Sequence, residues 1–150
     1  MIRQLQKDEK IPFDLLLLAD ETIEAINKYI NNAEIYIFER ANRIIGIYVL
    51  QKQDHNAIEI KNIAVDIAHQ GQGIGSFLIE DAVKKSKAKG FQRVLIGTGD
   101  ASIKQLYIYQ KAGFEIFEIK KNFFLDNYPE PIFENGIQLK HMIMLKKELD

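Results

Sequence analysis

The chain has no cysteine and only three histidines, and these shortages remove several kinds of chemistry. Without cysteine it can form no disulfide, no zinc site built on thiolates and no thiol nucleophile. The histidines, His55, His69 and His141, stand at unrelated spacings. Because metal ligands recur at defined separations, we expect no bound metal.

The chain also lacks a charge excess and a long apolar run. Its 20 basic and 21 acidic residues leave a net charge of −1. Chains that bind nucleic acid usually carry a basic excess, so we expect no nucleic-acid partner. The apolar run Leu15–Leu18 is far too short to cross a membrane, and no charged-then-apolar leader with a cleavage site precedes it. We therefore expect a cytoplasmic protein that does not associate with membranes.

What is present is typical of one folded domain, over residues 1–150, with 47% apolar residues to fill a core. Runs of β-branched residues predict strands at 2–5, 34–39, 44–51, 58–65, 93–98, 114–120 and 142–145. Helical spacing of apolar residues predicts helices at 12–19, at 22–31, after the glycines of residues 71–75 up to about 89, and at 101–112. A short connection at Asn42 predicts a hairpin. This order of elements predicts a mixed α/β sheet with helices on its faces.

The most informative segment runs from His69 to Ser76, with the sequence HQGQGIGS, between a predicted strand and a predicted helix. Three glycines at alternate positions remove side chains from the start of the helix, so a ligand can approach the backbone closely. The free N–H groups of a first helical turn and the positive end of the helix dipole both favour an anion. We therefore expect a phosphate-bearing ligand at this place.

Two familiar phosphate-binding loops do not fit the segment. A dinucleotide fingerprint, G-x-G-x-x-G, that starts at Gly71 requires glycine where Ser76 stands, and it should follow the strand directly. A nucleotide P-loop ends in Gly-Lys-Ser/Thr, but here Phe77 follows Ser76 and the lysine is missing.

The pattern that fits is Gln/Arg-x-x-Gly-x-Gly/Ala, found at residues 70–75, which we call the glycine loop. It resembles the coenzyme A loop of the GNAT family of N-acetyltransferases. A second segment, Ile108–Phe114, is similar to the family's Leu-Tyr-x-Lys-x-Gly-Phe, in the family's order and at about its spacing. The resemblance spans essentially the whole chain. It implies the GNAT-like acyl-CoA N-acyltransferase fold, a single domain with about seven mixed strands flanked by four helices.

The resemblance implies acetyl-CoA (coenzyme A) as the acetyl donor and no metal. Backbone N–H groups of the glycine loop are then expected to contact the diphosphate, and the pantetheine arm to pair with the strand that ends at Val65. Ser102 stands where many relatives carry an asparagine that holds a pantetheine carbonyl. The expected coenzyme A-binding residues are Ile63, Ala64, Val65, Gln70, Gly71, Gln72, Gly73, Ile74, Gly75, Ser76 and Ser102.

The resemblance also implies two catalytic residues. Tyr109 matches the family tyrosine beside the thioester sulfur, where a phenol with a pKa of about 10 gives a proton to the departing thiolate. The alternative is that Tyr109 only packs on its helix. Glu59 has the spacing of the glutamate base of the histone-acetylating branch, and the alternative is a strand carboxylate paired with Lys61.

The acceptor is not specified by the resemblance. The candidate walls are the early helices and residues 122–136 of the irregular stretch 122–139, where aromatic side chains and carboxylates suit an ammonium group. Phe123, Phe124 and Phe133 are expected to pin this stretch onto the sheet. We expect acetyl transfer to a primary amine of a small molecule or peptide, by direct attack in a ternary complex, in a monomer or homodimer. The alternative is a catalytically weak coenzyme A-binding regulatory module.

Overall fold

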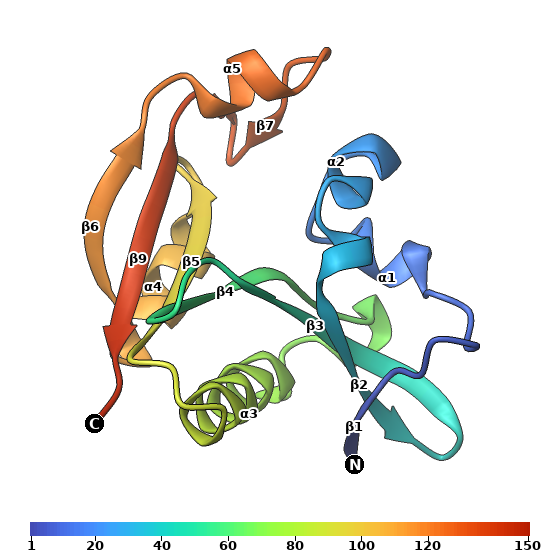
Figure 1. Ribbon diagram of the computed structural model, residues 1–150. Helices are drawn as coiled ribbons and strands as arrows, with labels where there is room; N and C mark the ends of the chain where they lie inside the picture. Colours follow the sequence, from blue (N-terminus) through green and yellow to red (C-terminus); the bar gives the residue numbers. More distant parts are fainter.

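Seven strands form one mixed sheet in the computed structural model, which describes residues 1–150. They are β1 (Ile2–Gln4), β2 (Glu34–Arg40), β3 (Arg43–Lys52), β4 (Ala57–Val65), β5 (Arg93–Gly99), β6 (Glu115–Lys120) and β9 (Met142–Glu148). Their order in the sheet is β1-β2-β3-β4-β5-β9-β6 (Figure 1). All neighbours are antiparallel except β4 and β5, which are parallel. The predicted mixed sheet is confirmed.

Five α-helices accompany the sheet, one more than predicted. They are α1 (Phe13–Leu16), α2 (Ile23–Asn27), α3 (Ile74–Ala88), α4 (Ile103–Lys111) and α5 (Phe123–Asn127), with the 3-10 helices η1 (Ile30–Asn32) and η2 (Ile67–His69). A separate hairpin consists of β7 (Phe133–Glu134) and β8 (Ile137–Gln138). Both α5 and this hairpin fall in the stretch that was predicted to be irregular. None of the helices has the length and apolar character that crossing a bilayer requires.

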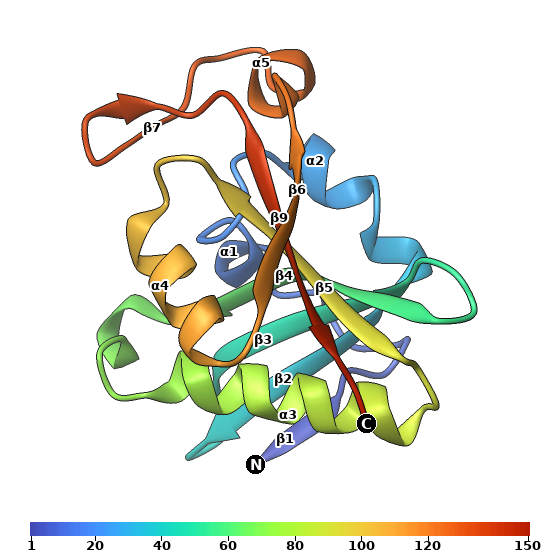
Figure 2. The same cartoon turned by 90° about the vertical axis from the view of Figure 1, so that its left-hand side faces the viewer.

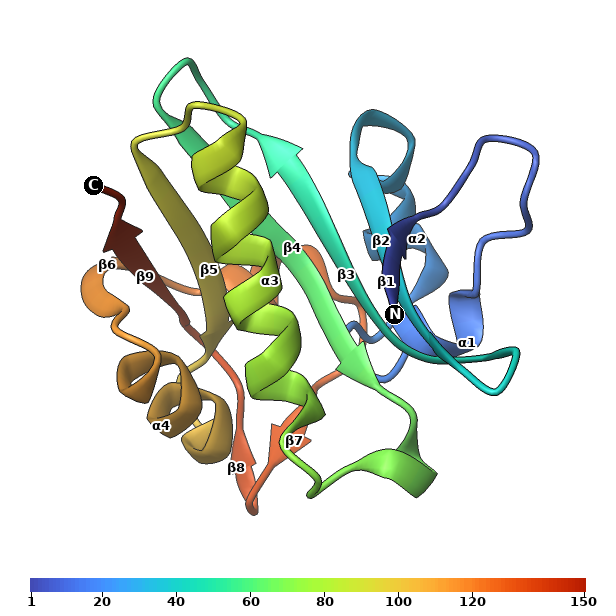
Figure 3. The same cartoon turned by 90° about the horizontal axis from the view of Figure 1, so that it is seen from below.

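Helices cover both faces of the sheet, and each face has its own core. Helices α3 and α4 lie on one face (Figure 3), where Leu78 and Ile96 are almost completely buried. Helices α1 and α2 cover the opposite face, where Leu16 and Ile37 are fully buried. Phe77, in the first turn of α3, is half exposed.

The β2–β3 hairpin turns through Ala41 and Asn42, whose φ angles are 52° and 62°. Positive φ at both central residues gives the backbone twist that suits a two-residue hairpin. Arg40 pairs with Arg43 across the turn. The hairpin that Asn42 predicts is thereby confirmed.

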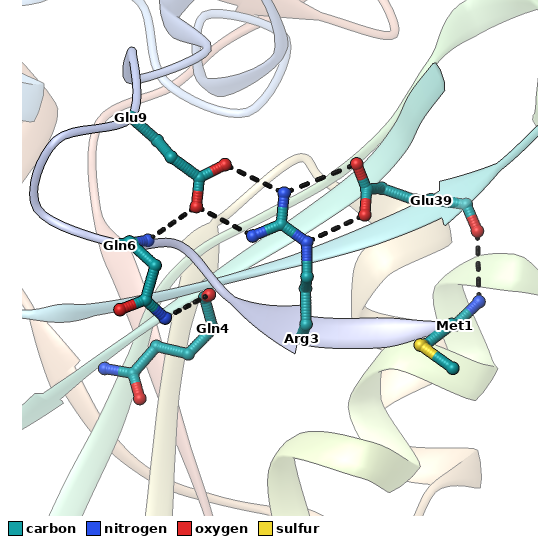
Figure 4. Close-up of polar contacts among 6 residues, drawn as sticks. All are labelled: Met1, Arg3, Gln4, Gln6, Glu9 and Glu39. Carbon is teal, nitrogen blue, oxygen red and sulfur yellow. Dashed lines mark hydrogen bonds and ion pairs between the residues drawn. The ribbon is translucent and has the colours of Figure 1, made fainter. Parts of the chain in front are cut away.

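Strand β1 is fastened to the sheet by a small ionic network (Figure 4). The Arg3 guanidinium donates hydrogen bonds to the carboxylates of Glu9 and Glu39, with its shortest contacts at 2.7 and 2.8 Å respectively. The Met1 ammonium donates to the Glu39 carbonyl oxygen at 3.0 Å. Hydrogen bonds from Arg3 and from the Gln6 amide lower the pKa of Glu9 to about 2, and Arg3 also lowers the pKa of Glu39.

The divergence of β4 from β5 creates an opening in the sheet. Their pairing stops at Ile60 and Ile96, although β4 continues to Val65 and β5 to Gly99. Beyond that point the facing edges of the two strands have no strand partner, and Figure 1 shows the strands separating. Free backbone groups therefore line a gap at the centre of the molecule.

Residues 122–139 form a cap beyond the ends of β5 and β9 (Figure 2). The rings of Phe124 and Tyr128 stack with centroids 5.9 Å apart, and both pack against a small core that contains Ile132. Phe133 is 61% exposed, so the expectation that it pins this segment is wrong. Its strand is two residues long and lies outside the main sheet, which leaves the ring without a surface to cover it.

Candidate functional site

A cleft of about 400 Å³ occupies the opening between β4 and β5. Its lining includes the diverging halves of both strands, the glycine loop with the start of α3, and one side of α4. The turn between α1 and α2 and the cap at residues 122–139 complete it. Several distant parts of the chain thus converge on one cavity, which is the usual setting of a small-molecule site.

The start of α3 presents six consecutive backbone amides, those of residues 71–76, that have no hydrogen-bond acceptor in the protein. Gly71 and Gly73 have φ angles of 79° and 81°, a left-handed conformation that glycine adopts without strain. The next amide, of Phe77, donates to the Gly73 carbonyl oxygen at 3.1 Å. A row of free donors at the positive end of a 15-residue helix favours an anion, and it fits a diphosphate.

Gln70 ties the glycine loop back to β4. Its amide donates to the Ile67 carbonyl oxygen at 3.3 Å, and its side-chain Nε2 donates to the Val65 carbonyl oxygen at 3.0 Å. Just before it, His69 Nδ1 lies 3.0 Å from the Asp66 carboxylate. The Gln70 amide is therefore already used inside the protein, unlike the six amides that follow it.

The edge of β4 that faces the opening has room for an additional strand. Ile63, Ala64 and Val65 pair with β3 on their other edge, and all three line the cleft. Main-chain groups at a free strand edge can bind an extended ligand arm whatever the local side chains are. This geometry fits the pantetheine arm that the resemblance implies.

Tyr109 lies on the buried side of α4 and lines the cleft. Its hydroxyl makes no hydrogen bond to another residue; burial and then the charge of Glu134 raise its pKa above the usual value. The phenol therefore stays protonated, as a donor without a partner. Tyr107, two residues earlier, is exposed on a different side of the helix.

Ser102 immediately precedes α4, is buried and lines the cleft. Its side chain makes no capping hydrogen bond, so its hydroxyl is free to meet a ligand. Among the expected coenzyme A-binding residues, only Gln72 stands outside the cleft lining, because its side chain is exposed on the outer side of the loop. The structure therefore brings the others together around one cavity.

Glu59 is not brought to the cleft. Its side chain is buried, and its carboxylate lies 3.5 Å from Lys61 Nζ. This position matches the alternative that the sequence left open, a strand carboxylate paired with a neighbouring lysine. The structure thus separates Glu59 from Tyr109, which does line the cleft.

A polar cluster that sequence reasoning missed lies at the cleft, and we call it the Asp20 cluster: Asp20, Tyr29, Asn62 and Tyr128. Tyr128 Oη donates to Asp20 Oδ1 at 2.6 Å, and Tyr29 Oη donates to Asp20 Oδ2 at 3.2 Å. Asn62 Nδ2 donates to Tyr29 Oη at 3.1 Å and to the Leu16 carbonyl oxygen at 3.0 Å. Asp20, Asn62 and Tyr128 line the cleft.

The members of the Asp20 cluster are scattered along the chain, so no spacing could reveal them. The available signal was Asn62, a polar residue in a strand made mostly of apolar residues. No group of three or more His, Asp or Glu side chains is placed to hold a metal ion.

The Acetyltransferase (GNAT) family model matches residues 1–114. The chain is 44% identical over 137 residues to the uncharacterized N-acetyltransferase YvbK of Bacillus subtilis strain 168, a match that covers 91% of this chain and 88% of YvbK.

Two solved structures closely resemble this fold. One is a GNAT family acetyltransferase from Elizabethkingia anophelis with acetyl-CoA bound, with a TM-score of 0.98 and 50% identity over 99% of this chain and 97% of that one. The other is a Bacillus subtilis acetyltransferase in complex with CoA, with a TM-score of 0.92 and 41% identity over 99% of this chain and 97% of that one. With a family model that spans most of its length, the chain belongs to the GNAT family of acetyltransferases.

Proposed function

We propose that this enzyme transfers the acetyl group of acetyl-CoA to a primary amine of a small molecule or peptide. The observation that carries the proposal is the row of free amides at residues 71–76, on the same cleft as the free hydroxyl of Tyr109. The two similar structures that contain acetyl-CoA or CoA support the choice of donor. Coenzyme A, which both structures contain, carries a diphosphate that these free amides can bind.

The remaining lining residues complete the donor site in this proposal. The amides of residues 71–76 hold the diphosphate, with the Ser76 hydroxyl as an additional donor. The free edge of β4 at residues 63–65 holds the pantetheine arm by main-chain hydrogen bonds. Ser102 contributes its free hydroxyl next to that arm. Tyr109 then stands at the thioester end.

The mechanism we infer is direct attack by the amine in a ternary complex. The new bond joins the amine nitrogen to the acetyl carbonyl carbon, the carbon–sulfur bond breaks, and the sulfur leaves as a thiolate. The Tyr109 hydroxyl, kept protonated by burial, donates its proton to that sulfur. The attacking nitrogen releases its remaining extra proton as the amide forms, and the phenolate of Tyr109 regains a proton through water. Because the chain has no cysteine, no acetyl-cysteine intermediate can form. Much of the acceleration then comes from holding the amine and the thioester in attack geometry.

The acceptor must lose a proton before it attacks, because a lysine-like amine has a pKa of about 10.4. Glu59 lies outside the cleft, and we give it no part in this step. The proton passes to water in the open cleft. Turnover at low amine concentration should therefore rise about tenfold per pH unit below the pKa of the amine.

Initial-rate kinetics with a panel of primary amines tests the proposal, with thiol release as the signal. Reciprocal plots for a ternary complex intersect, whereas an acetylated enzyme gives parallel lines. Parallel lines would refute direct attack. Thiol release that never exceeds the rate without amine would refute the function and favour the alternative of a catalytically weak coenzyme A-binding module, which the comparisons do not favour.

A further inference from the structure

Asp20 carries a negative charge at the cleft without a cation to balance it. Its carboxylate accepts hydrogen bonds from Tyr128 and Tyr29 and from the Glu21 amide, at 2.6, 3.2 and 2.8 Å. No lysine, arginine or histidine lies within ion-pair distance of it. Neutral donors therefore hold the carboxylate in place while leaving its charge available to a ligand.

Asn62 supplies a second, independent observation at the same place. The residue is 4% exposed and lines the cleft, and both of its Nδ2 hydrogen bonds go to Leu16 and Tyr29. Its Oδ1 atom is buried and has no hydrogen-bond partner. Leaving a buried acceptor unpaired is unfavourable, so this oxygen requires a donor that the protein itself does not provide.

The charges around the cleft point to a cationic ligand. Glu21 and Glu134 also line it, and neither of them forms an ion pair. Together with Asp20 they give this cavity three carboxylates that no protein cation neutralises. A ligand with its own carboxylate or phosphate would meet like charge near Asp20.

Of the three cationic side chains that line the cleft, Lys61 and His69 are paired with carboxylates of the protein, and Lys104 is not. Lys61 is paired with Glu59, and its ammonium lies 5.6 Å from the centre of the Tyr29 ring. His69 precedes the glycine loop and Lys104 is in the first turn of α4, so both stand on elements proposed to hold the donor. The unbalanced negative charge thus belongs to the part of the cleft that remains for the acceptor.

We propose that the Asp20 cluster is the acceptor subsite, and that it takes the ammonium group of a primary amine that carries no carboxylate or phosphate. This inference rests on the proposed function. The ammonium has three N–H donors, which suit Asp20 and the free Oδ1 of Asn62. The neighbouring Phe124 and Ile132 give the body of the amine an apolar surface.

Matched pairs of acceptors test the proposal on the wild-type enzyme, where folding is not in question. The pairs are 2-phenylethylamine with phenylalanine, and 1,4-diaminobutane with ornithine, which differ by one carboxylate. At saturating acetyl-CoA, we expect kcat/KM for each amine to exceed that for its amino acid by at least about tenfold, the effect of one charged hydrogen bond.

The variant Asp20→Asn removes the charge and keeps the size and the acceptor oxygen for Tyr128. We expect the KM for the better amine to rise about tenfold to a hundredfold, while kcat changes much less. The KM for acetyl-CoA and the affinity for coenzyme A, measured by calorimetry without acceptor, should stay unchanged. Glu80→Gln is the matched control, since Glu80 is an exposed carboxylate on α3 outside the cleft.

The outcomes separate the two proposals. Amines and amino acids acetylated equally well, or an unchanged amine KM in Asp20→Asn, would overturn the acceptor subsite and leave the proposed function standing. A wild-type enzyme that acetylates none of the four compounds nor any other primary amine would overturn the proposed function, and the subsite with it. Selective acetylation of the amines that is lost in Asp20→Asn would support both.

Discussion

The hydroxyl of Tyr128 donates a 2.6 Å hydrogen bond to Oδ1 of Asp20, a residue 108 positions earlier in the chain. Asp20 lies in the turn between α1 and α2, and Tyr128 directly follows α5. Figure 1 shows these elements on opposite sides of the opening in the sheet. The bond therefore joins two walls of the cleft that are otherwise built from opposite ends of the chain.

Replacing Tyr128 by phenylalanine should loosen this connection without removing the ring that stacks on Phe124. Because the lost hydrogen bond goes to a charged and partly buried acceptor, we expect the free energy of unfolding to fall by about 1–2 kcal/mol. Urea denaturation measures the change. Tyr107→Phe is the control, since the Tyr107 side chain is exposed and should lose little stability. Equal stability of both variants would show that the hydrogen bond between the two walls adds nothing to the free energy of unfolding.

Gly73→Asp should abolish coenzyme A binding, because it places a carboxylate among the free amides of residues 71–76. The substitution also strains the backbone, since Gly73 has a φ of 81°. Gly90→Asp is a matched control at the other end of α3, with a φ of 91° and equally open surroundings. Calorimetry with coenzyme A should detect binding to Gly90→Asp and not to Gly73→Asp. Similar affinities for coenzyme A in the two folded variants would show that the diphosphate does not bind at the glycine loop.

Tyr109→Phe should lower kcat about a hundredfold or more while the KM for acetyl-CoA changes little, because it removes the proton donor and keeps the ring. Circular dichroism checks the fold, and stability should hold, since the Tyr109 hydroxyl makes no hydrogen bond to another residue. Tyr107→Phe again serves as the control. A kcat equal to that of the wild type would leave Tyr109 with a packing role only.

The elements that the sequence predicted well are those with a long local pattern. The strand expected at residues 58–65 is Ala57–Val65 in the structure, because a run rich in β-branched residues favours the extended backbone of a strand. The helix expected at residues 12–19 contracts to Phe13–Leu16, since Leu17 and Leu18 face solvent and nothing packs there to extend it. Helix α5 was missed because five residues are too few to show a helical period.

The difference between local and long-range patterns also explains which parts of the site could be predicted. The glycine loop is contiguous, so its residues could be predicted together from local sequence. Tertiary folding alone brings Asp20 together with Tyr29, Asn62 and Tyr128. Such contacts between distant residues cannot be predicted from a single sequence. Glu59 had a suitable spacing, but spacing did not reveal that its side chain packs against Lys61 instead of opening into the cleft.

Glu9→Gln should destabilise the protein at neutral pH and have little effect in strong acid. Hydrogen bonds from Arg3 and the Gln6 amide lower the pKa of Glu9 from about 4.5 to about 2. The ionised carboxylate is therefore more stable in the folded state than in the unfolded state. The stability from Glu9 is therefore fully present above about pH 4.5 and is lost as the pH falls toward 2.

The melting temperature measures this effect: that of the wild type should exceed that of Glu9→Gln at pH 6, and the gap between them should close by pH 2. Because the network is partly exposed to solvent, added salt should narrow the gap at pH 6. Glu130→Gln, which removes a carboxylate without an ion pair, should show no such gap. If the melting-temperature gap for Glu9→Gln stays constant from pH 6 to pH 2, the ion pair with Arg3 is not its cause.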